Sequence, residues 1–140
     1  MAYELNELVE MLKSKGYEIE WNVTRRLGDV EIFANAVAKT KGFRYVSVRR
    51  EENCRPLIPL ERFSVAVARL LGVKGFAVTS NGEDVMCLRV DNGKNVSLED
   101  IPDANEAQPL DFNFDEERES RIAVAIGKLR CPCKQGECRI

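Results

Sequence analysis

The chain has 140 residues, of which 44% are apolar and 31% charged, so its composition is typical of one folded domain and excludes a wholly disordered segment. No apolar run reaches the ~18 residues of a membrane-spanning helix, and the acidic first sixteen residues are unlike a secretory signal. We therefore expect a cytoplasmic protein that does not contact a membrane. The net charge is only −2 and histidine is absent, which excludes Ser-His-Asp triads, Cys-His pairs and His-ligated metals.

The hydrophobic pattern predicts a regular alternation of elements along the chain. Apolar residues at helical spacing predict a first helix at residues 3–15, which Gly16 ends. Alternating apolar and polar residues predict the next three strands, and an apolar helix then leads to a hairpin turning at Asn81-Gly82. These segments are strands at 17–23, 30–37 and 43–49, a helix at 60–71, and strands at 75–80 and 85–90.

An acidic loop at 97–115 precedes a last helix at 116–129, with an expected apolar face of Ile122, Ala125, Ile126 and Leu129. The order α-β-β-β-α-β-β-α allows a parallel crossover between the third and fourth strands. It predicts an α/β fold with a mixed sheet flanked by helices. We expect one domain at 1–130, followed by a cysteine-containing tail at 131–140.

Charge is unevenly distributed along the chain. Residues 21–82 carry eleven basic and five acidic residues, whereas residues 83–117 carry two basic and eleven acidic residues. Clustered cations set a local field whatever the total charge, so the basic block at 21–82 points to an anion such as nucleic acid. The acidic stretch favours a protein partner.

Several motifs resemble the restriction-endonuclease-like, or PD-(D/E)xK, core. They are ELVEMLKSKGYEIEWNV, then Gly28-Asp29-Val-Glu-Ile, then Tyr45-Val-Ser-Val-Arg-Arg50, and an apolar helix leading to GVKGFAVTSNGE. The pattern is similar to archaeal Holliday junction resolvases and Mrr-like nucleases. This resemblance covers roughly residues 3–90. It implies a restriction-endonuclease-like fold, Mg²⁺-dependent hydrolysis of DNA phosphodiesters, and a homodimer.

The same resemblance assigns the site residues. Asp29 matches the aspartate that opens the second strand, and Glu7 matches a glutamate of the first helix. The Glu-x-Lys position on the third strand holds Ser47-Val48-Arg49 instead, and serine is a poor ligand for Mg²⁺. Glu31 is therefore the candidate second carboxylate, and Arg49 the candidate phosphate clamp.

The arginines around this site are candidate DNA contacts. Besides Arg49, they are Arg25, Arg26, Arg50 and Arg55. Each candidate also has a plain structural interpretation: Asp29 as a turn residue, Glu31 and Glu7 as solvated side chains, and the arginines as surface ion pairs. Trp21 and Phe43 are candidates for stacking on bases, although we expect them in the core.

Five cysteines leave an odd count, and a cytosolic location disfavours a disulfide framework. Cys131, Cys133 and Cys138 are close enough in sequence to bind Zn²⁺ or an iron–sulfur cluster, with Cys54 or Cys87 as a fourth ligand. Redox chemistry within the tail and free thiols are the alternatives. We expect Cys87, on an apolar strand, to lie in the core.

Two interpretations of function stay open. In the first, the chain is a nuclease-like domain, either a Mg²⁺-dependent DNA endonuclease or an inactive relative that binds DNA. In the second, it is a non-catalytic module that binds a protein or a nucleic acid, with the cysteines as a metal or redox element.

Overall fold

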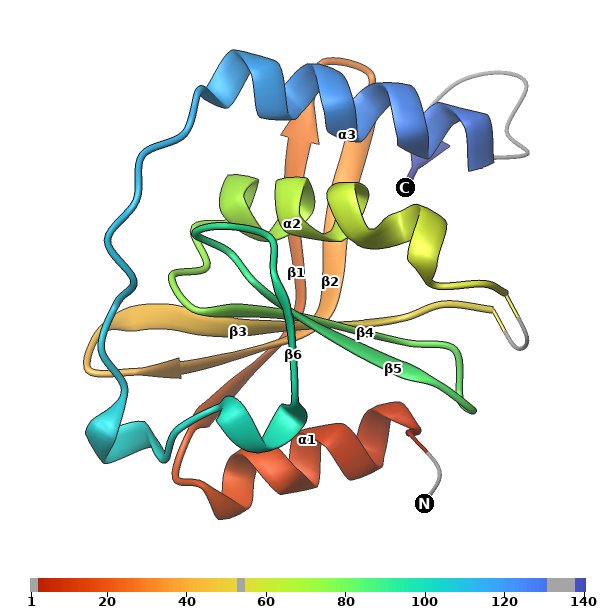
Figure 1. Ribbon diagram of the computed structural model, residues 1–140. Helices are drawn as coiled ribbons and strands as arrows, with labels where there is room; N and C mark the ends of the chain where they lie inside the picture. The colour runs from red at the N-terminus through yellow and green to blue at the C-terminus, as the bar shows by residue number, and fades with distance from the viewer. Residues whose placement is uncertain (1–2, 53–54, 131–137) are drawn as a thin grey trace.

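The computed structural model describes residues 3–52, 55–130 and 138–140 (Figure 1). Its main elements are α1 (Leu5–Ser14), β1 (Glu18–Leu27), β2 (Val30–Thr40), β3 (Phe43–Arg50), α2 (Glu61–Leu70), β4 (Phe76–Ser80), β5 (Val85–Arg89), β6 (Asn95–Val96), α3 (Glu116–Arg130) and β7 (Cys138–Arg139). Short 3₁₀ turns lie at Ile58–Leu60, Leu98–Asp100 and Ala104–Glu106. None of the helices in these ranges is long and apolar enough to cross a membrane.

The strands form one mixed sheet in the order β1-β2-β3-β4-β5-β6. β1, β2 and β3 pair antiparallel, whereas α2 carries the chain across to β4, which pairs parallel with β3. β5 and β6 then continue the sheet antiparallel. This arrangement confirms the predicted α/β class and the predicted order of helices and strands.

The helices cover both faces of the sheet, with α1 on one face and α2 and α3 on the other (Figure 1). Under α1, a cluster that includes Leu12, Tyr45 and Phe76 fills the core. Under α2 and α3, a second cluster includes Ile32, Phe63 and Val67. α1 covers one cluster, and α2 and α3 cover the other. Removal of the helices from either face would therefore expose a large apolar surface to water.

The β1–β2 ribbon is longer than the sequence suggests. Residues 24–28 were expected to break the first strand, but β1 continues to Leu27, which lies opposite Val30. Only Gly28 and Asp29 form the turn, and Gly28 adopts φ 65°, which glycine tolerates in a tight hairpin. The ribbon thus reaches past α2 to α3 (Figure 1).

The ribbon bends midway along its length. Asn22 adopts φ 52°, a left-handed conformation that a strand residue rarely takes. Across this point the buried residues of β2 change sides, because Ala34 packs under α2 and α3 whereas Ala36 packs under α1. Because of the bend, the β1–β2 ribbon contributes buried residues to the clusters on both faces of the sheet.

α3 is attached to α2 by charge as well as by apolar contact. The buried carboxylate of Glu119 binds Arg69 at 2.5 Å and Arg62 at 2.6 Å. The expected apolar face of α3 was wrong in part, since Leu129 is 88% exposed and Ala125 is also exposed. The buried stripe instead centres on Glu119, Ala123 and Gly127, a pattern that hydrophobic spacing does not reveal.

Residues 138–140, assigned to the tail from sequence, belong to the sheet. β7 pairs parallel with Val30 and Glu31 of β2, and the Ile140 amide donates to the Glu31 carbonyl at 2.9 Å. The Ile140 side chain is buried against Gly127, where an added Cβ would lie 2.2 Å from Ile140 Cδ1. The boundary predicted at residue 130 therefore does not separate these residues from the domain, whereas Cys131 and Cys133 lie outside the described residues.

Glu119→Gln tests the buried ion pairs that hold α3. We expect it to lower the free energy of unfolding by about 3 kcal/mol, because two arginines lose the charge that compensates their desolvation. Urea denaturation of the purified protein gives this value. Glu117→Gln, on the exposed side of the same turn, is the matched control and should change the stability by less than about 0.5 kcal/mol.

Cys87 lies in the core under α1, as expected from the sequence. Burial raises the pKa of its thiol to about 12, with a smaller contribution from the nearby negative charge of Asp100. Because the thiolate is the nucleophile, we expect no alkylation of Cys87 by iodoacetamide at about pH 8 in the folded protein. Peptide mass spectrometry should find the adduct only after unfolding in urea, and rapid labelling of the native chain would contradict this burial.

Candidate functional site

The candidate site lies where β2 and β3 separate. The two strands pair from Thr40 opposite Phe43 to Ala36 opposite Val48, and beyond that point β2 turns toward β7 while β3 stays beside β4. The separation leaves backbone groups without ladder partners, and such groups require other hydrogen bonds when buried. Sequence analysis placed Glu31, Arg49 and Arg50 on these two strands.

Arg49 supplies part of the missing hydrogen bonding. Its Nη1 donates to the carbonyl of Phe33 at 2.6 Å and to that of Ile140 at 3.3 Å. The guanidinium lies over the rings of Phe33 and Phe63, with its carbon 4.5 and 4.9 Å from the ring centroids. Only 5% of the side chain is exposed, so Arg49 does not face solvent as a phosphate clamp would.

A buried carboxylate balances this charge. Glu51 Oε2 lies 3.5 Å from Arg49 Nη2, and the Glu51 side chain is likewise only 5% exposed. A buried cation without a partner would be costly, so the pair is needed once Arg49 is placed here. The pair therefore holds Glu51, which directly follows β3, in the core beside Arg49.

Arg50 points to the other face, toward α1. Its amide donates to Asn35 Oδ1 at 2.8 Å, which replaces another ladder hydrogen bond. Its guanidinium binds both carboxylate oxygens of Glu4, at 3.1 and 3.2 Å, and also donates to the Glu51 carbonyl. Arg50 thus ties the start of α1 to the end of β3.

The candidate metal ligands have separate partners. Asp29 lies in the β1–β2 turn, four residues before Phe33, whose carbonyl binds Arg49. Its side chain is 75% exposed, with Lys128 Nζ 3.7 Å away. Glu31 faces Arg139 at 3.6 Å, and α1, which carries Glu7, lies at the opposite end of the molecule from the turn (Figure 1).

No group of three or more Cys, Asp or Glu side chains in the described ranges is arranged to hold a metal ion. Each candidate has a partner of its own: Asp29 faces Lys128, Glu31 faces Arg139, and the buried Arg49 lies beside Glu51. Of the candidate thiol ligands, Cys54, Cys131 and Cys133 lie outside those ranges, only the backbone of Cys138 is described, and Cys87 is buried in the core.

The basic block at 21–82 is largely neutralised by carboxylates. Arg25 binds Glu116, Arg44 binds Glu20 at 2.9 Å, and Arg55 binds Glu52 at 3.5 Å. With the buried and half-buried pairs described above, seven arginines of the block have a carboxylate partner in the described residues: Arg25, Arg44, Arg49, Arg50, Arg55, Arg62 and Arg69. Arg26 is exposed on β1.

The aromatic candidates divide between surface and core. Trp21, expected in the core, is 47% exposed on the outermost strand β1. Phe43 is half-buried and packs edge-on against Tyr45, with ring centroids 5.8 Å apart, as the core expectation required. Trp21 is thus the one of the two that a partner could reach.

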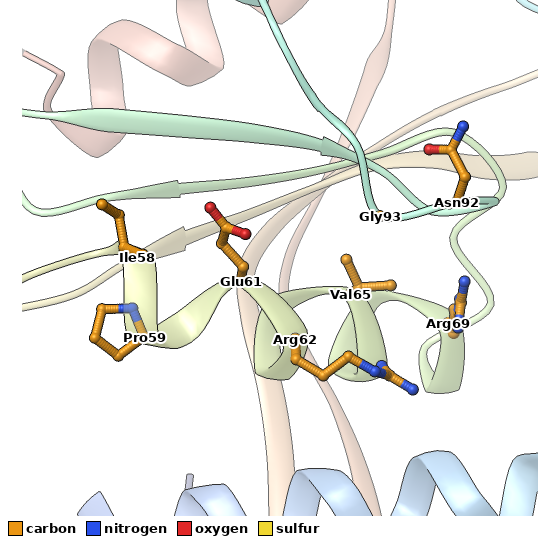
Figure 2. A pocket seen from close by; sticks show the side chains of 8 residues that line it. All are labelled: Ile58, Pro59, Glu61, Arg62, Val65, Arg69, Asn92 and Gly93. Atoms are coloured by element: carbon orange, nitrogen blue, oxygen red, sulfur yellow. The ribbon is translucent and has the colours of Figure 1, made fainter.

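A pocket of about 400 Å³ lies between α2 and the turn at Asn92 and Gly93 (Figure 2). Val65 and the carboxylate of Glu61 point toward the strands, whereas Arg62 points toward α3, where it binds Glu119. Arg69 is also committed to Glu119 and to the Val90 carbonyl. The pocket therefore has a single charged group directed into it and no set of groups suited to acid–base or nucleophilic catalysis.

Sequence analysis missed Glu4 and Asn35 at this site. It considered Glu51 as an ion-pair partner of these arginines, but at the surface, whereas the pair with Arg49 is buried. Glu51 directly follows Arg49-Arg50, and a carboxylate beside two arginines near a strand end is a usable signal for an ion pair. Nothing local marks Glu4 or Asn35, since their partner Arg50 is 46 and 15 residues away.

Comparison of the chain with protein-family models, curated proteins and solved structures finds no match. Function must therefore be inferred from the geometry of the chain itself.

Arg49→Met tests whether Arg49 holds the fold together. We expect a loss of about 3 kcal/mol in the free energy of unfolding, because Glu51 is left buried without its partner. The double variant Arg49→Met/Glu51→Leu should recover part of this loss, since an apolar pair replaces a buried ion pair. Arg55→Met is the control, because its exposed pair with Glu52 contributes little. A neutral Arg49→Met would contradict a structural role for this residue.

Proposed function

We propose that this chain is a non-catalytic, protein-binding relative of the restriction-endonuclease-like nucleases. The order α1-β1-β2-β3-α2-β4, with β3 and β4 parallel, supports the relationship, because it is the arrangement that the sequence resemblance implies. Under this proposal the chain has the fold of these nucleases without their catalytic activity, because one fold commonly hosts several functions.

The burial of the motif strand carries the proposal. Ser47 and Arg49 occupy the positions of the glutamate and the lysine, and both side chains are buried. A nuclease of this kind needs carboxylates that hold Mg²⁺ beside the scissile phosphate and a cation that stabilises the developing charge. Here Arg49 is bonded to two carbonyls of its own chain, and the Asp29 side chain is 75% exposed and faces Lys128.

The distribution of charge favours a protein partner over DNA. Affinity for DNA comes mainly from cations that neutralise phosphates, and most arginines of the basic block already face carboxylates. An exposed tryptophan on an outermost strand is instead a feature of protein interfaces, where aromatic side chains contribute most of the binding energy. Binding to DNA through Arg26 and its neighbours is the alternative that the experiment must exclude.

A cleavage assay tests the non-catalytic part of the proposal. Wild type and Asp29→Ala are incubated with Mg²⁺ or Mn²⁺ and branched, single-stranded or duplex DNA. We expect no cleavage above the buffer control for either protein, because the buried guanidinium of Arg49 is already bonded to two carbonyls and paired with Glu51. Cleavage by wild type that Asp29→Ala abolishes would overturn the proposal and restore the nuclease hypothesis.

Fluorescence anisotropy with labelled DNA tests the choice of partner. We expect binding to be undetectable at about 150 mM salt, with any weak association at low salt lost as counterions compete. Arg26→Glu serves as the comparison, since this exposed arginine is a candidate phosphate contact. Tight, salt-resistant binding that Arg26→Glu weakens would show that DNA, not protein, is the partner.

A further inference from the structure

The second half of β1 has an open edge. In the described part of the chain, β1 is the first strand of the sheet and pairs on one side only, with β2. Asn22, with φ 52°, interrupts this pairing, but Val23–Leu27 lie opposite Val30–Ala34 without a break. The segment contains no proline, so its outer side presents backbone donors and acceptors at the regular spacing of a strand.

An apolar groove of about 520 Å³ adjoins the end of this edge. Leu27 and Gly28 form one side of the groove, and residues between Glu117 and Ala125 of α3 form the other. α3 passes across the end of the β1–β2 ribbon (Figure 1), and farther along this helix Gly127 packs against Ile140, which is bonded to β2. The groove therefore lies on the β1 side of the ribbon, where a further strand of the sheet would run.

The side chains of β1 show how the edge and the groove are connected. Val23 and Leu27 pack in the cluster under α2 and α3, and Arg25 reaches the same face, where it binds Glu116. Residues that lie opposite each other on neighbouring strands have their side chains on the same face of the sheet. A strand added at this edge would therefore place alternate side chains beside those of Val23, Arg25 and Leu27, and the one beside Leu27 would enter the groove.

The open edge determines the class of molecule that fits. An extended polypeptide offers amides and carbonyls at the spacing of a strand, whereas a helix satisfies its own backbone groups. The groove adds a requirement for charge, because Glu117 and Arg121 also line it and neither has an oppositely charged partner among the described residues. An extended segment that carries an apolar residue together with charges of both signs is complementary to this surface.

We propose that Val23–Leu27 and the adjoining groove bind an extended segment of another protein. The segment joins the sheet as a strand beside β1 and places one apolar side chain between Leu27 and α3. This inference rests on the proposed protein-binding function and names the surface and the form of the partner. Main-chain hydrogen bonds supply the affinity in this kind of pairing, and the groove supplies the selectivity.

A phage-displayed library of random peptides about twelve residues long, without cysteine, is the probe. Peptides selected on the wild-type chain are synthesised with a fluorophore, and anisotropy titrations give their dissociation constants. We expect values of roughly 1–100 µM and an apolar residue at one recurring position of the selected sequences.

Ala125→Glu tests the groove. Because Ala125 is exposed, the added carboxylate leaves the fold intact but lies against the apolar side chain of the bound peptide. The affinity should fall about tenfold or more. Leu129→Glu is the matched control, since it also replaces an exposed apolar residue of α3 with an acid, but outside the groove, and it should bind like wild type. Far-ultraviolet circular dichroism confirms that both variants are folded.

A scan of N-methylated peptides tests the strand pairing. Methylation of a backbone amide removes its hydrogen, and a strand that pairs on one side donates to its neighbour from every second residue. The affinity should therefore fall at alternate positions of the peptide and stay unchanged at the positions between them.

Four results would overturn the inference: a library that yields no binding peptide, binding that Ala125→Glu leaves unchanged, an equal loss in Leu129→Glu, or a methylation profile without alternation. Sedimentation equilibrium of the chain alone supplies a fifth, because self-association that Ala125→Glu abolishes would assign the groove to a second copy. A chain that cleaves DNA and binds peptides in the groove contradicts only the non-catalytic part of the proposed function. An inactive chain that selects no peptide contradicts only the inference about β1 and the groove.

Discussion

The buried guanidinium of Arg49 is the interaction on which the rest of the structure depends. Where β2 leaves β3, the regular ladder ends, and a sheet opened in this way would leave buried carbonyls without donors. Arg49 bonds to the carbonyls of Phe33 and Ile140 at this point and so connects β2, β3 and the segment after β7. The cost of burying its charge explains the position of Glu51 and the two phenylalanine rings that enclose it.

The same use of arginine recurs across the molecule. Arg50 joins β3 to the residue before α1, Arg25 joins β1 to α3, and Arg62 and Arg69 together join α2 to α3 through Glu119. Each arginine comes from the basic block. Glu4 and Glu116 come from the acidic segments at 1–16 and 83–117, and Glu119 lies just after the second. The basic block that suggested a nucleic-acid site therefore has a second explanation: its arginines form ion pairs with carboxylates of other segments of the same chain. This explanation needs no external anion.

The fold was predictable because its signals are local. Alternation of apolar residues marks the strands, Gly16 marks the end of the first helix, and the helix before β4 implies the parallel crossover. The misses arose where a distant residue decides the outcome. Thr24–Leu27 are polar enough to suggest a break, yet they continue β1 because Val30–Phe33 pair with them and Leu27 packs against the core under α2 and α3. Leu129 and Ala125 were expected inside, but Glu119 and Gly127 orient α3 differently, through partners on α2 and at Ile140. The candidate site was harder to predict than the fold. Its chemistry depends on the distance between Asp29 and Arg49, and that distance follows from the register of β2 against β3, which no local sequence signal reveals.

The attachment of residues 138–140 also constrains how the chain folds. Val30 and Cys138 are neighbours in the sheet although more than a hundred residues separate them in sequence. Closing so long a loop is entropically expensive, and contacts of this range form late in folding. During synthesis, α3 therefore has no isoleucine to fill the space beside Gly127, and Arg49 lacks one of its two carbonyls, until residue 140 has left the ribosome tunnel. The nascent domain thus passes through a stage in which this end of its sheet is exposed, and that stage ends when residues 138–140 dock beside β2.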